Sequence, residues 1–157
     1  MKMKFSEDLP DVIDQEIDFI GQLFLEYEQF TTNPDVLNRQ DGIRSLEGIF
    51  YDFVDHVVHI IRFGFDLVNY QEESDESPFI SAEDDRIKFF LGLILSDKTL
   101  NQFDPFLKFY SGFSYLYPSK IDLNILTNLI SDFPHTVESV SADLRIFAQK
   151  LRGGDAW

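Results

Sequence analysis

The chain contains no cysteine, and this absence removes several classes of protein. It excludes disulfides, thiolate zinc sites, iron–sulfur clusters and a cysteine nucleophile. It also fits a reducing cytoplasm, which is where we expect the protein to reside. Long apolar runs are missing as well: the longest candidates, residues 53–68 and 89–95, are short or interrupted by charge, so no membrane span is expected. The first ten residues carry two lysines with no apolar stretch behind them, unlike a signal peptide.

Basic residues are scarce. Lys and Arg total 13 against 28 Asp and Glu, which gives a formal net charge of −15. A protein that contacts nucleic acid over a broad surface needs clustered Lys and Arg, so this class is disfavoured and tight RNA binding is not expected. The same charge permits a basic protein partner that is attracted electrostatically.

The composition is that of a folded domain. The chain has 157 residues, of which 44% are hydrophobic and 15% aromatic, with 17 Phe. A disordered acidic segment would lack this aromatic content. The length suits one domain spanning residues 1–157, with an ordered core over residues 10–151 and a loose tail over residues 152–157.

Apolar residues recur at helical spacing. Ile13, Ile17 and Ile20 begin a stripe that continues to Tyr27 and predicts a helix over residues 10–30. The sequence TTNPD then breaks the pattern, and a second long helix follows, with apolar positions from Leu46 to Val68. Three glycines weaken this second helix and allow a kink or an interruption: Gly42, Gly48 and Gly64.

Polar and proline residues predict where the later helices begin and end. Ser81 is expected to cap a helix whose apolar face lies over residues 87–95. Asp104-Pro105 looks like the start of a fourth helix that ends at Tyr117-Pro118. A short helix over residues 123–130 and a last one from Pro134 to Leu151 complete the chain. No segment alternates as a strand would, so we predict an all-α, up-and-down bundle of four or five main helices.

The densest cluster of potentially functional residues runs from Tyr51 to His59. Two carboxylate–imidazole pairs, Asp52 with His56 and Asp55 with His59, are each four residues apart and share one strip of a helix. These are suitable ligands for zinc or iron. The alternative is an ion-paired helix face with one histidine partly buried, which is favoured because a di-metal bundle needs matching ligands on facing helices. The third histidine, His135, beside Pro134 at an expected helix start, does not supply them. No bound metal or other cofactor is therefore expected.

Other catalytic patterns are missing. There is no G-x-S-x-G nucleophile turn, and Gly153-Gly154 stands in the tail without a following helix, unlike a phosphate-binding loop. The aromatic stripe over residues 103–117 is typical of a core or an oligomer interface, and the charged run over residues 72–76 is typical of a solvated loop.

The order of three segments resembles the HEPN superfamily, and within it the HepT-like helical proteins of toxin–antitoxin systems. Tyr51-Asp52-Phe53-Val54-Asp55-His56 is similar to that family's Y-x-x-[IV]-E-N pattern. Ser81-Ala82-Glu83-Asp84 resembles its mid-chain entry into a helix. The segment FLKFYSGFSYLY, from Phe106 to Tyr117, followed by Ile121-Asp122-Leu123, resembles F-R-x-F-R-H-x-x-x-H-x-Y and its downstream D-L.

The resemblance implies a ribonuclease fold that has lost its chemistry. Active members are metal-independent ribonucleases with an R-x(4–6)-H motif, in which Arg stabilises charge on the phosphate and His moves a proton. No Arg in this chain has a His at that spacing. Tyr110 and Tyr115 fall at the Arg and His positions, Tyr117 keeps the final Tyr, and Asp55 and His56 replace the acidic and amide residues. Tyrosine is a poor base at pH 7.

Two kinds of partner remain open. The resemblance implies a homodimer and a nucleotidyltransferase-type antitoxin that modifies the motif Tyr. The alternative is an acidic immunity or antitoxin protein that blocks a basic nuclease or pore-former, as the small size, the negative charge and the acidic run over residues 72–76 suggest. On the first interpretation, a cleft would gather six residues: Asp55, His56, Lys108, Tyr110, Tyr115 and Tyr117.

Overall fold

Five α-helices and one short 3₁₀ helix lie within the residues that the structure describes. The computed structural model describes residues 7–64, 80–113 and 121–154 and, for residues 80–85, the backbone alone. Over these ranges no strand occurs. The elements are α1 (Leu9–Thr31), η1 (Val36–Asn38), α2 (Gln40–Gly64), α4 (Ile80–Ile94), α5 (Asp97–Gly112) and α6 (Leu123–Arg152).

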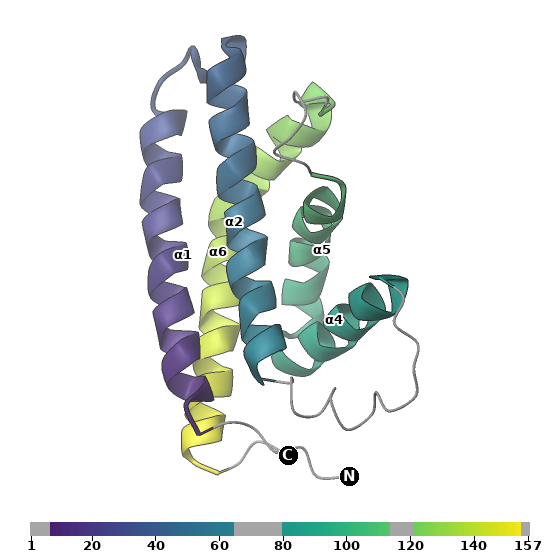
Figure 1. Ribbon diagram of the computed structural model, residues 1–157. Helices are drawn as coiled ribbons and strands as arrows, with labels where there is room; N and C mark the ends of the chain where they lie inside the picture. Colours follow the sequence, from purple (N-terminus) through teal and green to yellow (C-terminus); the bar gives the residue numbers. More distant parts are fainter. Residues whose placement is uncertain (1–6, 65–79, 114–120, 155–157) are drawn as a thin grey trace.

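The three long helices lie side by side, as Figure 1 shows, with α1 and α2 running in opposite directions. Helix α1 packs on both α2 and α6, and α5 packs on the same two helices, α2 and α6, from the other side. Helix α4 is oblique to them and lies at the end of the bundle where α2 finishes (Figure 1). The predicted all-α helical bundle is confirmed. None of the helices within the described ranges has the length and apolarity that a membrane crossing requires.

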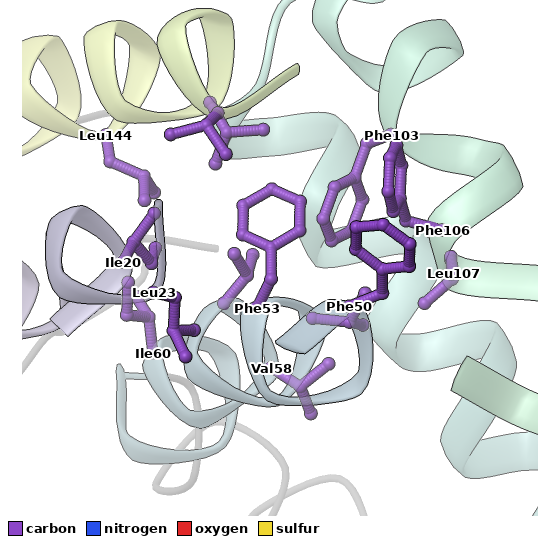
Figure 2. Close-up of a cluster of buried hydrophobic side chains, with 14 of the residues drawn as sticks. Ile20, Leu23, Phe50, Phe53, Val58, Ile60, Phe103, Phe106, Leu107 and Leu144 are labelled. Atoms are coloured by element: carbon purple, nitrogen blue, oxygen red, sulfur yellow. The ribbon is translucent and has the colours of Figure 1, made fainter. Parts of the chain in front are cut away.

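Phenylalanine dominates the core. The five largest fully buried side chains are Phe residues from three helices, and Figure 2 labels the four that come from α2 and α5. Phe53 of α2 meets Phe103 and Phe106 of α5 edge to face, with ring centroids 5.5 and 5.7 Å apart. The edge of an aromatic ring is electropositive and its face is electronegative, so this geometry is attractive and fixes how the rings pack in the core. The five are Phe50, Phe53, Phe103, Phe106 and Phe133.

Helix α1 agrees with the predicted stripe. It begins after Asp8, places Pro10 in its first turn and buries Ile13, Ile17 and Ile20. Proline is tolerated there because a first-turn residue has no helical hydrogen bond to lose.

The glycines predicted to weaken α2 do not interrupt it. Gly42 and Gly48 lie inside one continuous helix, and the helix ends at Gly64. Gly42 has a packing role, because a Cβ at this position would lie 2.3 Å from the carbonyl oxygen of Val36. Only glycine therefore allows η1 to approach the first turn of α2 so closely.

The helix starts predicted at Pro105 and Pro134 are both wrong, because each proline lies inside a longer helix. Helix α5 begins at Asp97, with the Ser96 hydroxyl accepting a hydrogen bond from the Thr99 N–H, so Pro105 is internal. It ends at Gly112, ahead of the predicted end at Tyr117-Pro118, which lies outside the described residues. The predicted cap at Ser81 is also wrong, because α4 already starts at Ile80.

Helix α6 is one helix, not two, and Tyr27 compensates for its internal proline. Pro134 has no N–H, so it cannot bond the carbonyl of Ile130 four residues earlier. The Tyr27 hydroxyl of α1 donates to this carbonyl oxygen at 2.6 Å. Burial, followed by the charge of Glu28, raises the pKa of Tyr27, so its hydroxyl stays protonated and able to donate. His135 accordingly lies in mid-helix, and not at a helix start.

We expect Tyr27→Phe to lower the free energy of unfolding by about 1–2 kcal/mol, because the partly buried carbonyl of Ile130 would lose its donor. Urea titration followed by circular dichroism measures the change. The control is a double-mutant cycle with Pro134→Ala, which restores an N–H to the helix. In the Pro134→Ala background the tyrosine substitution should have a clearly smaller effect. An equal effect in both backgrounds would contradict this account of the proline.

The ends of the bundle are joined by polar contacts between elements distant in sequence. Arg152, the last residue of α6, pairs with Asp11 and Asp14 of α1 at 2.9 and 2.6 Å. Arg152, predicted to begin a loose tail, thus lies in α6. At the α4–α5 junction the Ser96 N–H donates to the Asp143 carboxylate of α6 at 2.8 Å. These pairs are exposed, so they help to set register and add little stability.

Candidate functional site

The polar residues of α2 contact two different helices. Asp55 and His56 are adjacent in sequence, yet Asp55 meets α5 while His56 meets α1. Successive residues on a helix point about 100° apart, so neighbours along the chain face different partners. The predicted cluster from Tyr51 to His59 is therefore divided between two sites.

The site toward α1 is a histidine–carboxylate cluster formed by Glu16, His56 and His59. The His56 Nδ1 lies 2.5 Å from Glu16 Oε2, and the His59 Nδ1 lies 2.7 Å from Glu16 Oε1. The Glu16 side chain is only 6% exposed, whereas those of His56 and His59 are 28% and 57% exposed. One buried carboxylate thus holds two histidines from a neighbouring helix.

These contacts determine which nitrogen of each ring carries a proton. An ionised carboxylate only accepts hydrogen bonds, so each Nδ1 must donate an N–H to it. In a neutral imidazole the other nitrogen, Nε2, then keeps its lone pair. The ring of His56 also stacks on that of Phe19 of α1, with centroids 5.2 Å apart and planes inclined by 20°. The cluster therefore fixes both the orientation and the tautomer of His56.

The site toward α5 joins Asp55 to Tyr110. The Tyr110 hydroxyl donates to Asp55 Oδ1 at 2.9 Å, and its ring stacks on Tyr51, with centroids 4.6 Å apart. Burial, followed by the hydrogen bond to Asp55, raises the pKa of Tyr110 well above its ordinary value. Tyr110 is therefore a hydrogen-bond donor at neutral pH and cannot act as a base.

The structure brings together only some of the six residues predicted for a cleft. Asp55 and Tyr110 are in contact, and His56 is turned to α1. Lys108 lies two positions from Tyr110, on another side of α5, and its Nζ pairs with Asp104 Oδ2 at 3.0 Å. Tyr115 and Tyr117 lie outside the described residues.

The four residues weighed as metal ligands do not converge. Asp55 bonds Tyr110, while His56 and His59 bond Glu16; Asp52 shares their helix but completes no group with them. Within the ranges that the structure describes, no group of three or more His, Asp and Glu side chains is arranged to hold a metal ion.

Sequence reasoning missed two buried acidic residues. Glu16 lies in the apolar stripe of α1, between Ile13 and Ile20, and a carboxylate at such a position was a usable signal of a buried polar partner. Glu47 of α2 is 3% exposed, its Oε1 lacks a hydrogen bond within the described residues, and Arg44 Nη1 lies 3.7 Å from this oxygen. The Arg44 guanidinium also covers the Phe113 ring at 4.8 Å. Arg44 and Glu47 therefore form an ion pair within α2.

A comparison with protein-family models, with curated proteins and with solved structures finds no significant match to this chain. The resemblance to HEPN proteins therefore remains a prediction that depends on motif positions.

Proposed function

We propose that this protein is a HepT-like member of the HEPN superfamily that has lost ribonuclease chemistry and acts by binding another protein. The contact between Asp55 and Tyr110 carries the proposal. The motif alignment assigns these residues to the positions where the family has its acidic residue and its catalytic Arg. Their hydrogen bond at 2.9 Å joins the two motif segments, on α2 and α5, and this contact supports the proposal.

The chemistry at these positions supports loss of catalysis. RNA cleavage without a metal needs a cation beside the phosphate and a base that titrates near neutrality. At the motif position of the cation stands Tyr110, which is uncharged and bonded to a carboxylate. His56, which directly follows Asp55, is bonded to Glu16 on the side facing α1. Tyr110 and His56 therefore do not form the pair of cation and base that the family's reaction needs.

We expect the purified chain to leave a structured RNA intact over hours at pH 7, because the sequence lacks the Arg and His of the family's catalytic motif. Gel electrophoresis of labelled RNA, with and without the protein, is the measurement. Tyr110→Phe and Asp55→Ala are the controls. Cleavage by the unchanged protein that is lost in either variant would show that the site is catalytic and overturn the proposal.

The negative charge of α1 indicates which class of partner the protein could bind. This helix carries six carboxylates and no Lys or Arg. Glu16 is buried and two others pair with Arg152, but the exposed Asp18, Glu26 and Glu28 favour the second candidate function, an acidic immunity or antitoxin protein that blocks a basic toxin. Association driven by such charge is fast and weakens with salt. The six are Asp11, Asp14, Glu16, Asp18, Glu26 and Glu28.

A pull-down from the native host in low salt, analysed by mass spectrometry, distinguishes the two functions. Recovery of a nucleotidyltransferase-like protein supports the HepT-like function. Recovery of a strongly basic protein that is released by salt supports the immunity function instead. Light scattering on the purified chain tests the homodimer that the first function implies. A monomer that retains no specific partner in either salt condition would contradict both functions.

A further inference from the structure

The histidine–carboxylate cluster leaves two imidazole nitrogens open. Both Nδ1 atoms are engaged by Glu16, and neither Nε2 atom has a hydrogen bond to any part of the chain that the structure describes. The carboxylate is buried beneath the rings, while the His59 ring is more than half exposed and that of His56 more than a quarter. In the neutral form of each ring, the Nε2 lone pair is therefore not used by the protein, and both rings belong to the same face of α2.

This arrangement is the one that prepares histidine to bind a metal. In metal sites the ligating histidine donates its second ring N–H to a carboxylate, which orients the ring, selects the tautomer and increases the basicity of the free nitrogen. Glu16 makes this hydrogen bond to both His56 and His59. Imidazole suits Zn²⁺, Cu²⁺ and Ni²⁺, whereas Mg²⁺ and Ca²⁺ prefer oxygen.

The spacing and the charge fit a single ion. His56 and His59 are three residues apart on α2, so their side chains are neighbours on one face, and both Nδ1 atoms lie against the oxygens of the same carboxylate. Helical bundles place metal ligands at this same spacing. The net charge of −15 also attracts cations.

We propose that His56 and His59 bind one divalent transition-metal ion through their Nε2 atoms, with Glu16 as the positioning residue. Water fills the remaining coordination positions, since the described residues offer no third ligand at the cluster. Asp55, which was weighed as a ligand from the sequence, takes no part because it bonds Tyr110. An open two-histidine site follows the general order of affinity, so Cu²⁺ binds more tightly than Ni²⁺ or Zn²⁺.

Calorimetric titration of the full chain with Cu²⁺, Ni²⁺ and Zn²⁺, after removal of metal by a chelator and dialysis, tests the proposal. One ion per chain with Cu²⁺ bound most tightly is expected. His135 provides a matched control, because it is exposed on α6 and lies outside the cluster. His56→Gln and His59→Gln should each lower the Cu²⁺ affinity at least tenfold, whereas His135→Gln should leave it unchanged.

The role of Glu16 is tested separately. Glu16→Gln should weaken Cu²⁺ binding about 10–100-fold, as loss of an outer carboxylate does in known metal sites. Circular dichroism verifies that each variant is folded, and the histidine variants keep the test valid if the Glu16 variant is not. Cu²⁺ binding that is absent, that survives both histidine substitutions, or that is lost in His135→Gln would overturn the proposal.

Discussion

Phe133→Ala is expected to lower the free energy of unfolding by about 3–5 kcal/mol, the largest effect of any single substitution that we predict. Phe133 of α6 is fully buried and its ring meets aromatic rings from three other helices. The loss combines the transfer of the ring from water with the cavity that remains. Small domains are stable by only about 5–15 kcal/mol, so the variant would lose a large part of its stability. The partner rings are Phe24, Tyr27, Phe50, Phe53 and Phe106.

Urea unfolding at 25 °C, followed by circular dichroism, measures the effect of Phe133→Ala. Phe89→Ala is the matched control, because the same atoms are removed from a residue of α4 that is 60% exposed. The control should change stability by less than about 1 kcal/mol. Equal losses in the two variants would mean that the aromatic cluster around Phe133 does not govern the stability of the bundle.

The sequence predicted the helices wherever burial alone sets their pattern. The stripe of α1 is visible because its buried residues recur every three or four positions. The prolines misled the prediction because their tolerance depends on contacts from other helices. Pro134 stays inside α6 because Tyr27, 107 positions earlier, donates to the carbonyl that the proline leaves unbonded. No pattern within α6 itself announces this donor.

The candidate site was predicted in part for a related reason. The sequence singled out Asp55, His56 and His59, since the spacing of residues on one helix is readable. It assigned them to one strip of the helix, but His56 bonds Glu16 of α1 while Asp55 bonds Tyr110 of α5, so they belong to two separate sites. Glu16 orients the two histidines toward α1, and Tyr110 orients Asp55 toward α5. The function of this region therefore depends on contacts between helices, which a motif on one helix does not encode.

Glu16→Ala is expected to lower the free energy of unfolding by about 2–3 kcal/mol at pH 7. It removes the acceptor of two hydrogen bonds and leaves a small void between α1 and α2. The loss stays below that of a fully buried ion pair because His59 is 57% exposed and its Nδ1 can bond water instead.

Glu16→Gln separates shape from charge at the same position. The amide oxygen can accept from one histidine Nδ1–H, and the amide N–H can donate to the other ring in its second tautomer, so the loss should be about 1 kcal/mol. Asp18→Asn, on the exposed side of α1, is the control and should stay within about 0.5 kcal/mol of the unchanged protein.

A double-mutant cycle shows whether these losses arise from the cluster. In a His56→Gln, His59→Gln background, Glu16→Ala should lower stability by at least 1 kcal/mol less than it does in the unchanged chain, because the hydrogen bonds it breaks are already gone. Guanidinium unfolding of the four proteins at pH 7, without added metal, provides the values. Identical losses in both backgrounds would mean that Glu16 stabilises the α1–α2 contact through packing alone, and that the two histidine hydrogen bonds contribute nothing to stability. Titrating the same four proteins with Cu²⁺ then measures ion binding by the cluster separately from its contribution to stability.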